Sequence, residues 1–151
     1  MLWQNRALNR IAVSNLEVGH DDTVLEIGFG SGAAIKLLTQ YSDARHICGI
    51  DPSDVMMEEA TARNEDAIAV GRVHLLRGTV LKLPFRNKEF SRVFAVSTFH
   101  DWKDRATGLR EIRKVLRDNG RLLLCLRPAS RVRLPWSLPG LTEANWQKTG
   151  N

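Results

Sequence analysis

The residues best suited to chemistry follow short apolar runs of the sequence. The first run, Val24 to Ile27, contains one acid, Glu26, and leads into alternating glycines. Glycine suits a turn with positive φ and lets a ligand approach the backbone where a Cβ would otherwise stand. A helical pattern follows, and the N-terminus of a helix offers unpaired N–H groups. We therefore predict a ligand site in this strand, turn and helix, at Gly28, Gly30 and Gly32.

Charge at this turn separates two ligand classes. The spacing Gly28-x-Gly30-x-x-Ala33 fits a loose form of the dinucleotide fingerprint, in which a helix N-terminus receives a pyrophosphate. Glu26 would repel a pyrophosphate, but it would attract an ammonium or sulfonium group. The sequence therefore favours S-adenosylmethionine as the cofactor, and an NAD(P)-binding oxidoreductase is the alternative.

The stretch from Val24 to Gly32 resembles motif I of the class I S-adenosylmethionine-dependent methyltransferases, of the small-molecule, ubiquinone/menaquinone-methyltransferase-like type. Asp51 closes a second apolar run about 20 residues after Gly32, the offset at which an acid meets ribose hydroxyls in this architecture. The resemblance runs from about Leu8 to Arg127. Further matches are Gly78, Leu83-Pro84-Phe85 and the stretch Leu116 to Leu124 (LRDNGRLLL).

The resemblance implies where the cofactor lies. In an open parallel sheet, ligands bind beyond the carboxyl ends of the strands, where the strand order reverses. The glycine turn would hold the methionine part, Asp51 the ribose and Thr79-Val80 the adenine edge, although the family often has an acid where this chain has Thr79. The residues expected to bind the cofactor are Glu26, Gly28, Phe29, Gly30, Gly32, Asp51, Pro52, Met56, Gly78, Thr79, Val80 and Ser97.

His100 is the candidate catalytic base, with Asp101 beside it in the sequence and Trp102 as a wall of the site. Methyl transfer from a sulfonium is an in-line displacement with a good leaving group, so positioning supplies much of the acceleration and no metal is required. A base helps when the acceptor is a hydroxyl or amine. The alternative is that this segment only turns the chain into the next helix, with Asp101 or Asp104 as its cap.

Composition predicts one globular domain over residues 1–151. Hydrophobic residues make up 43% and charged residues 26% of the chain, values typical of soluble proteins. The first 20 residues lack a signal-peptide core and an apolar span, so we expect a cytoplasmic protein without membrane contact. The stretch from Trp102 to Leu134 contains ten basic residues and three acids. We interpret this excess of positive charge as a solvated helix face rather than a nucleic-acid site. The expected partner is a small-molecule methyl acceptor.

Apolar periodicity predicts an α/β, doubly wound parallel sheet, and the resemblance implies a Rossmann-like fold with strand order 3-2-1-4-5. Leu109, Ile112 and Leu116 should face inward from the last helix, which is expected to stop at Asn119-Gly120. The expected strands are 23–27, 46–50, 73–76, 93–96 and 121–126, and the helices are 3–17, 33–41, one that begins after Pro52 and 104–117. Cys48 and Cys125 lie on strands ~14 Å apart, so we expect two buried thiols and no disulfide.

The segment after the fifth strand departs from the resembled family. Pro128, Pro135 and Pro139 interrupt it, and two strands that the family places there are missing from the pattern. The strand from Leu122 to Leu126 would then be an apolar sheet edge, which soluble proteins usually cover. We expect a homodimer, and the alternative is that residues 129–151 fold over the edge. A cofactor-binding or interaction domain without turnover is a further functional alternative.

Overall fold

The computed structural model describes residues 2–127 of the 151-residue chain. Within this part, five parallel strands form one sheet in the order β3-β2-β1-β4-β5, as predicted. The expected C-terminal features, including the interrupted segment and the missing strands, lie outside the described residues. The strands are β1 (Thr23–Ile27), β2 (His46–Asp51), β3 (Val73–Arg77), β4 (Phe90–Val96) and β5 (Leu116–Cys125).

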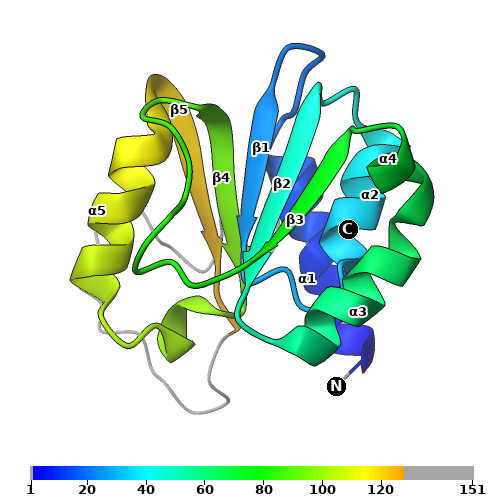
Figure 1. The fold of residues 1–151 in the computed structure, drawn as a ribbon, viewed down its shortest axis with the longest axis horizontal. Helices are drawn as coiled ribbons and strands as arrows, with labels where there is room; N and C mark the ends of the chain where they lie inside the picture. Colours follow the sequence, from blue (N-terminus) through cyan, green and yellow to red (C-terminus); the bar gives the residue numbers. More distant parts are fainter. Residues whose placement is uncertain (1, 128–151) are drawn as a thin grey trace, which may run out of the picture.

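Helices cover both faces of the sheet (Figure 1). One layer contains α1 (Leu2–Asn15), α2 (Ala33–Tyr41), α3 (Asp54–Arg63) and α4 (Glu65–Ala69), and the other contains α5 (Arg105–Val115). Successive strand residues point to opposite faces, so β1 contributes to two cores. Val24 packs in the core that includes Ile35 of α2, and Leu25 packs in the core that includes Ile112 of α5.

Side chains cap the first turns of two helices. The Ser53 hydroxyl accepts a hydrogen bond from the Met56 N–H at 3.3 Å and caps α3. Asp104 caps α5, since its carboxylate accepts from the Thr107 N–H at 3.0 Å. Of the two caps considered for α5, the structure thus uses Asp104. Each cap satisfies an N–H group that a helix leaves unpaired.

The boundary between α5 and β5 corrects the sequence prediction. The helix ends at Val115, and Leu116 to Gly120 belong to β5 instead of finishing the helix. Leu116 pairs with Phe90, so β4 also begins three residues earlier than expected. Leu109 is 38% exposed and does not face the core as predicted. Pairing between distant strand residues therefore overrides the local helical pattern here.

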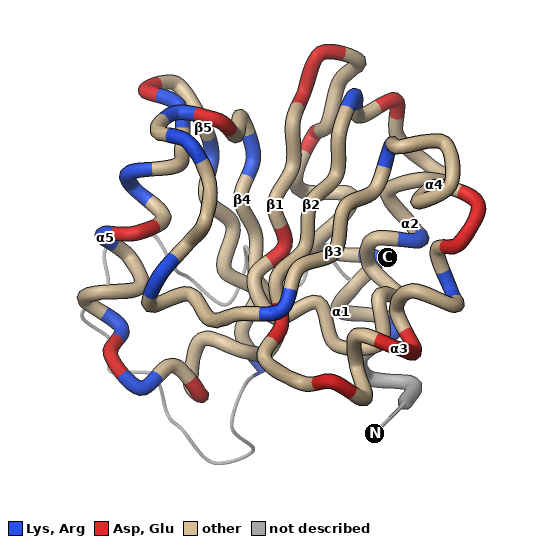
Figure 2. Tube along the Cα trace, in the orientation of Figure 1, with Lys and Arg blue, Asp and Glu red and all other residues tan. Residues whose placement is uncertain are grey.

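The charged side chains are unevenly distributed. Figure 2 shows Lys and Arg gathered on the side of the molecule that carries α5 and β5. Several of these cations are paired, including Lys114 with Glu111 at 2.7 Å and Arg121 with Glu17 at 3.1 Å. No helix between residues 2 and 127 is long and apolar enough to cross a membrane.

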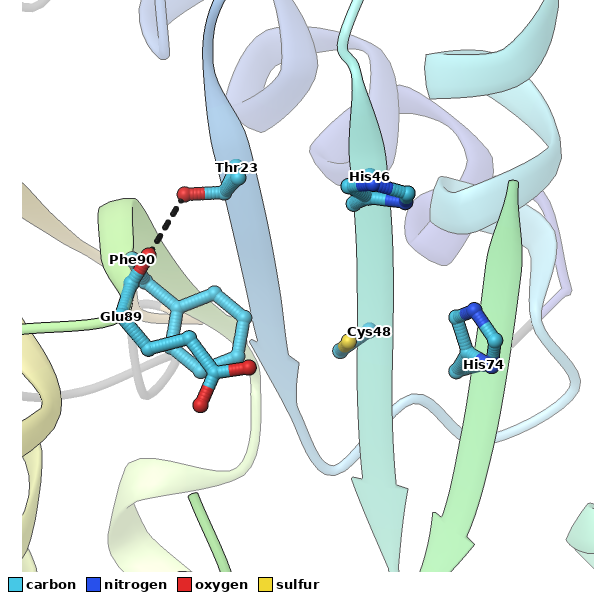
Figure 3. Close-up of a pocket in the computed structure, with 6 residues that line it drawn as sticks. All are labelled: Thr23, His46, Cys48, His74, Glu89 and Phe90. Carbon is cyan, nitrogen blue, oxygen red and sulfur yellow. Dashed lines mark hydrogen bonds between the residues drawn. The ribbon is translucent and has the colours of Figure 1, made fainter. Parts of the chain in front are cut away.

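A hollow of about 230 Å³ opens near the amino ends of the strands (Figure 3). Cys48 lies in it, and burial together with the Glu89 carboxylate raises the pKa of this thiol to about 11, so it is neutral near pH 7. Cys48 is buried as predicted, whereas Cys125 is partly exposed, and both are free thiols. The hollow is lined by Thr23, His46, Cys48, His74, Glu89 and Phe90, none of which was predicted to bind the cofactor.

Candidate functional site

The carboxyl ends of β1, β2 and β3 are joined by backbone hydrogen bonds. The Gly28 N–H donates to the Ile50 carbonyl at 2.7 Å, and the Gly78 N–H donates to the Asp51 carbonyl at 3.0 Å. These bonds continue the sheet beyond its last paired residues. The turn after β1 is therefore held in a fixed position relative to the ends of the two neighbouring strands.

The turn after β1 adopts the left-handed conformation predicted for its glycines. Gly28, Gly30 and Gly32 have φ values of 73°, 53° and 75°. A Cβ at Gly28 would stand 2.7 Å from Cγ2 of Thr98, and one at Gly32 would stand 2.7 Å from Cβ of Ala60. Both backbone angle and space thus require glycine at these two positions. The turn can pass closely between β4 and α3 as a result.

Asp51 ties the glycine turn to the start of α3. Its side chain accepts from the Gly30 N–H through Oδ2 and from the Ser53 N–H through Oδ1, both at 2.9 Å. The residue is only 7% exposed. Each carboxylate oxygen has a second lone pair that can accept a further hydrogen bond. Asp51 therefore fixes the loop and keeps acceptor capacity for a ligand.

Glu26 is the second buried carboxyl group at these strand ends. The residue is 2% exposed, and its Oε2 has no hydrogen-bond partner among the described residues. Burial, and then the negative charge of Asp51, raise the pKa of Glu26 well above its usual value. A buried acceptor without a partner is costly. Such an atom fits a ligand that brings a donor or a positive charge.

The end of β4 is strained where it meets the turn. Ser97 has φ of 57°, which is uncommon for a residue other than glycine, and its buried Oγ lacks a partner among the described residues. Its N–H donates to the Cys125 carbonyl at 2.8 Å, and the adjacent Thr98 hydroxyl donates to the Ile27 carbonyl at 3.2 Å. The neighbouring strands therefore hold Ser97 in its strained conformation.

His100 and Asp101 lie on a short 3₁₀ turn, Phe99–Asp101, that follows β4. His100 Nε2 is 3.5 Å from Asp101 Oδ2, and the two side chains are 58% and 73% exposed. The Arg105 guanidinium donates to the Phe99 and His100 carbonyls at 3.3 Å and lies 5.2 Å from the Phe99 ring centre. Arg105 thus braces the backbone that carries the candidate base.

The structure brings most of the predicted cofactor residues to the carboxyl ends of the strands, but two of their side chains pack in the hydrophobic cores. Phe29 is 3% exposed and packs in the core beside α2, and Val80 is buried beneath α5. Only their backbone remains available to a ligand. Thr79 is exposed, and its hydroxyl accepts from the Leu81 N–H at 3.3 Å. Pro52 is exposed and Met56 is half-buried at the start of α3.

Sequence reasoning missed Asn64, which supports the glycine turn from behind. Its buried side-chain amide donates to the Gly32 carbonyl at 3.1 Å and to the Ala60 carbonyl at 2.9 Å. The only local signal is a polar residue at the end of a helical pattern, which is more often a helix cap. Between residues 2 and 127, no group of three or more His, Cys, Asp and Glu side chains is arranged to hold a metal ion.

Comparison with known proteins identifies the family. Residues 25–124 match the model of a methyltransferase domain. The uncharacterized methyltransferase YdaC of Bacillus subtilis is 26% identical over 128 residues, which are 85% of this chain and 68% of that protein. The demethylmenaquinone methyltransferase of Thermotoga maritima is 32% identical over 123 residues, 81% of this chain and 48% of the relative. The chain thus spans about half to two thirds of these relatives.

Solved structures agree with this result. The YcgJ protein from Bacillus subtilis has a TM-score of 0.70 and 26% identity, over 78% of this chain and 49% of that one. A putative S-adenosylmethionine-dependent methyltransferase from Methanococcus maripaludis has a TM-score of 0.69 and 25% identity, over 79% of this chain and 53% of that one. Residues 25–124, which the family model matches, contain the glycine turn, both buried carboxyl groups and the turn after β4. This chain belongs to the methyltransferase domain family.

Proposed function

We propose that this chain binds S-adenosylmethionine at the carboxyl ends of β1, β2 and β4 and directs its methyl group to a small-molecule acceptor. The observation that carries the proposal is Glu26 Oε2, a buried acceptor without a partner among the described residues, at the base of a left-handed glycine turn. A cationic ligand would stabilise the charged form of this carboxyl group, whereas a pyrophosphate offers it no positive charge. Family membership further supports S-adenosylmethionine over NAD(P).

Each buried carboxyl group has a separate role in the proposed complex. Glu26 attracts the ammonium end of the cofactor, and Asp51 accepts from the ribose hydroxyls with the acceptor capacity that its two backbone bonds leave free. The backbone of Gly78 and Thr79 lies beside the adenine. Because Thr79 is uncharged, its hydrogen bond to the adenine is weaker than a carboxylate would make.

The turn after β4 performs the remaining steps. When bound, the cofactor would supply a methyl group attached to a sulfonium. The electrons of the broken S–C bond stay on sulfur, which becomes a neutral thioether. Ser97 and the backbone that Arg105 braces orient the acceptor for in-line attack. His100 takes the proton of a hydroxyl or amine acceptor, and Asp101 Oδ2 lies 3.5 Å from its Nε2.

The acceptor that we propose is a small molecule. The relatives include a demethylmenaquinone methyltransferase and an O-methyltransferase from Aspergillus nomiae, 32% and 31% identical to this chain. We infer a hydroxyl-bearing acceptor, such as a phenol or the reduced form of a quinone, whose hydroxyl proton His100 would remove. The two free cysteines suit a cytoplasmic location, where thiols stay reduced.

We also propose that the chain forms a homodimer through β5. Within the described residues, β5 pairs with β4 alone and ends the sheet. Its residues Leu122, Leu123 and Leu124 are each only partly buried. An apolar edge strand with unpaired backbone groups favours association, and two-fold symmetry is the commonest solution.

Cofactor binding is the first test of the proposed function. S-adenosylmethionine or S-adenosylhomocysteine should stabilise the folded protein, by ~2.7 kcal/mol at 100 times the dissociation constant. NAD and NADP should leave the unfolding temperature unchanged, because a pyrophosphate supplies no positive charge for the buried Glu26 carboxyl group. The measurement is thermal unfolding of the purified chain with each ligand. Stabilisation by NAD alone would contradict the assignment.

Removal of the Asp51 carboxylate should weaken cofactor binding. We expect Asp51→Ala to cost about 1.5–3 kcal/mol of binding free energy, because a charged acceptor for the ribose is lost. Calorimetric titration with S-adenosylhomocysteine measures this loss. Asp54→Ala is the matched control, since Asp54 is exposed and pairs with Arg77 at 3.1 Å. Equal affinities for both variants would show that the ribose is held elsewhere.

His100 should affect turnover more than cofactor binding. With a phenol or quinol acceptor, we expect His100→Gln to lower turnover ~10²–10⁴-fold while the affinity for S-adenosylhomocysteine stays the same. The assay follows S-adenosylhomocysteine formation with a panel of such acceptors. His20→Gln changes an exposed histidine before β1 and serves as the control. Unchanged turnover in the His100 variant would show that His100 is only part of the segment that connects β4 to α5.

The dimer proposal predicts a mass of two chains in solution. Light scattering over a concentration series measures this mass directly. Leu123→Lys places a charge on the edge strand and should shift the equilibrium to monomers, whereas Leu109→Lys on exposed α5 should not. A wild-type protein that stays monomeric and soluble at high concentration would contradict the proposal.

A further inference from the structure

The starting point is the pair of carboxyl groups at the ends of β1 and β2. Glu26 is opposite Gly49 in the register of these parallel strands, and Asp51 lies two residues further along β2. Both residues are buried, at 2% and 7% exposure. The Asp51 oxygens already accept two backbone N–H groups, an arrangement that suits a charged carboxylate. Oε2 of Glu26 has no such donor within the described part of the chain.

Two adjacent buried carboxylates are costly when both are charged. Burial raises the pKa of Glu26 most, and the charge of Asp51 raises it further. The glycine turn itself carries no charged side chain between positions 28 and 32. Charged side chains on the other surrounding elements are exposed or half-buried, so solvent screens them more strongly. They are Arg6 and Arg10 on α1, Lys36 on α2, Asp54 on α3, Arg77 on β3, Arg92 on β4, which pairs with Asp22 at 3.6 Å, and His100 and Asp101 after β4.

We propose that Glu26 is a neutral carboxylic acid in the empty site and gives up its proton when the cofactor's ammonium group arrives. This rests on the proposed binding of S-adenosylmethionine. The O–H bond of the Glu26 carboxyl group breaks, the proton passes to water or buffer, and the resulting carboxylate pairs with the ammonium group. Cofactor binding and release of one proton are therefore the same event.

The direction of the pH dependence follows from this exchange. Below the pKa of Glu26 in the empty protein, the association constant should rise with pH, by up to about tenfold per unit. Above that pKa, Glu26 is already ionised and the affinity should level off. The stability of the empty protein should change in the opposite direction over this pH range. Its folded state holds the Glu26 proton more tightly than its unfolded state, so the free energy of unfolding falls as pH rises from the usual glutamate value of 4.5 towards the raised pKa.

Calorimetric titration with S-adenosylhomocysteine tests the proposal, because this ligand carries the ammonium group but cannot transfer a methyl group. Titrations at the same pH in phosphate and in Bis-Tris differ in heat by the number of protons released multiplied by the difference between the ionisation enthalpies of the two buffers. We expect nearly one proton at mildly acidic pH and a decline at higher pH. Glu26→Gln should abolish the release and flatten the pH dependence of affinity. Glu17→Gln, at an exposed glutamate, should leave both unchanged.

The possible failures separate the two proposals. Binding with equal heats in both buffers at every pH would overturn the proton release and leave the proposed function standing. Absence of binding at every pH would overturn both. The empty protein supplies an independent measurement: Glu26→Gln should remove the loss of unfolding free energy with rising pH that Glu26 causes in the wild type. The same pH dependence in both proteins would contradict a neutral Glu26.

Discussion

The hydrogen bond from the Gly30 N–H to the Asp51 carboxylate is the contact on which the site depends. It joins a left-handed turn, which glycine alone adopts without strain, to the end of the neighbouring strand. The second oxygen of Asp51 holds the first turn of α3 through the Ser53 N–H. One side chain therefore links the glycine turn after β1, the end of β2 and the start of α3. The cofactor site that we propose is the space in front of this junction.

The same strand ends contain groups that do not favour folding. Glu26 and Ser97 each bury a polar oxygen without a partner among the described residues, and Ser97 also has a strained backbone. Folding tolerates such costs only where the surrounding structure fixes the residues. Here the register of β1 with β2 and β4 supplies that constraint. Costly groups that gather on adjacent strand ends are consistent with a ligand that satisfies them.

The sequence predicts the fold well where local pattern and long-range packing agree. Short apolar runs separated by helical patterns were enough to predict a parallel sheet, the family resemblance implied its strand order, and the alternating glycines were enough to predict a left-handed turn. The prediction failed at Leu116, where pairing with Phe90 converts an expected helix end into a strand. Local periodicity carries no information on that distant partner.

The site residues show the same division. The buried positions of Glu26 and Asp51 follow from their places in apolar runs, Glu26 inside the first run and Asp51 at the end of the second. The sequence does not predict that the side chains of Phe29 and Val80 pack in the two cores, because a motif does not say in which direction each of its side chains points. Asn64 was missed for a related reason: its contact with Gly32 joins residues 32 positions apart.

A crystal structure of the chain with S-adenosylhomocysteine tests the central claim most directly. We predict that the ligand's ammonium nitrogen lies within hydrogen-bond distance of Glu26 Oε2, and that its ribose hydroxyls contact Asp51 while the Gly30 N–H bond to that residue persists. A ligand bound in the hollow beside Cys48, or a ribose held away from Asp51, would contradict the account.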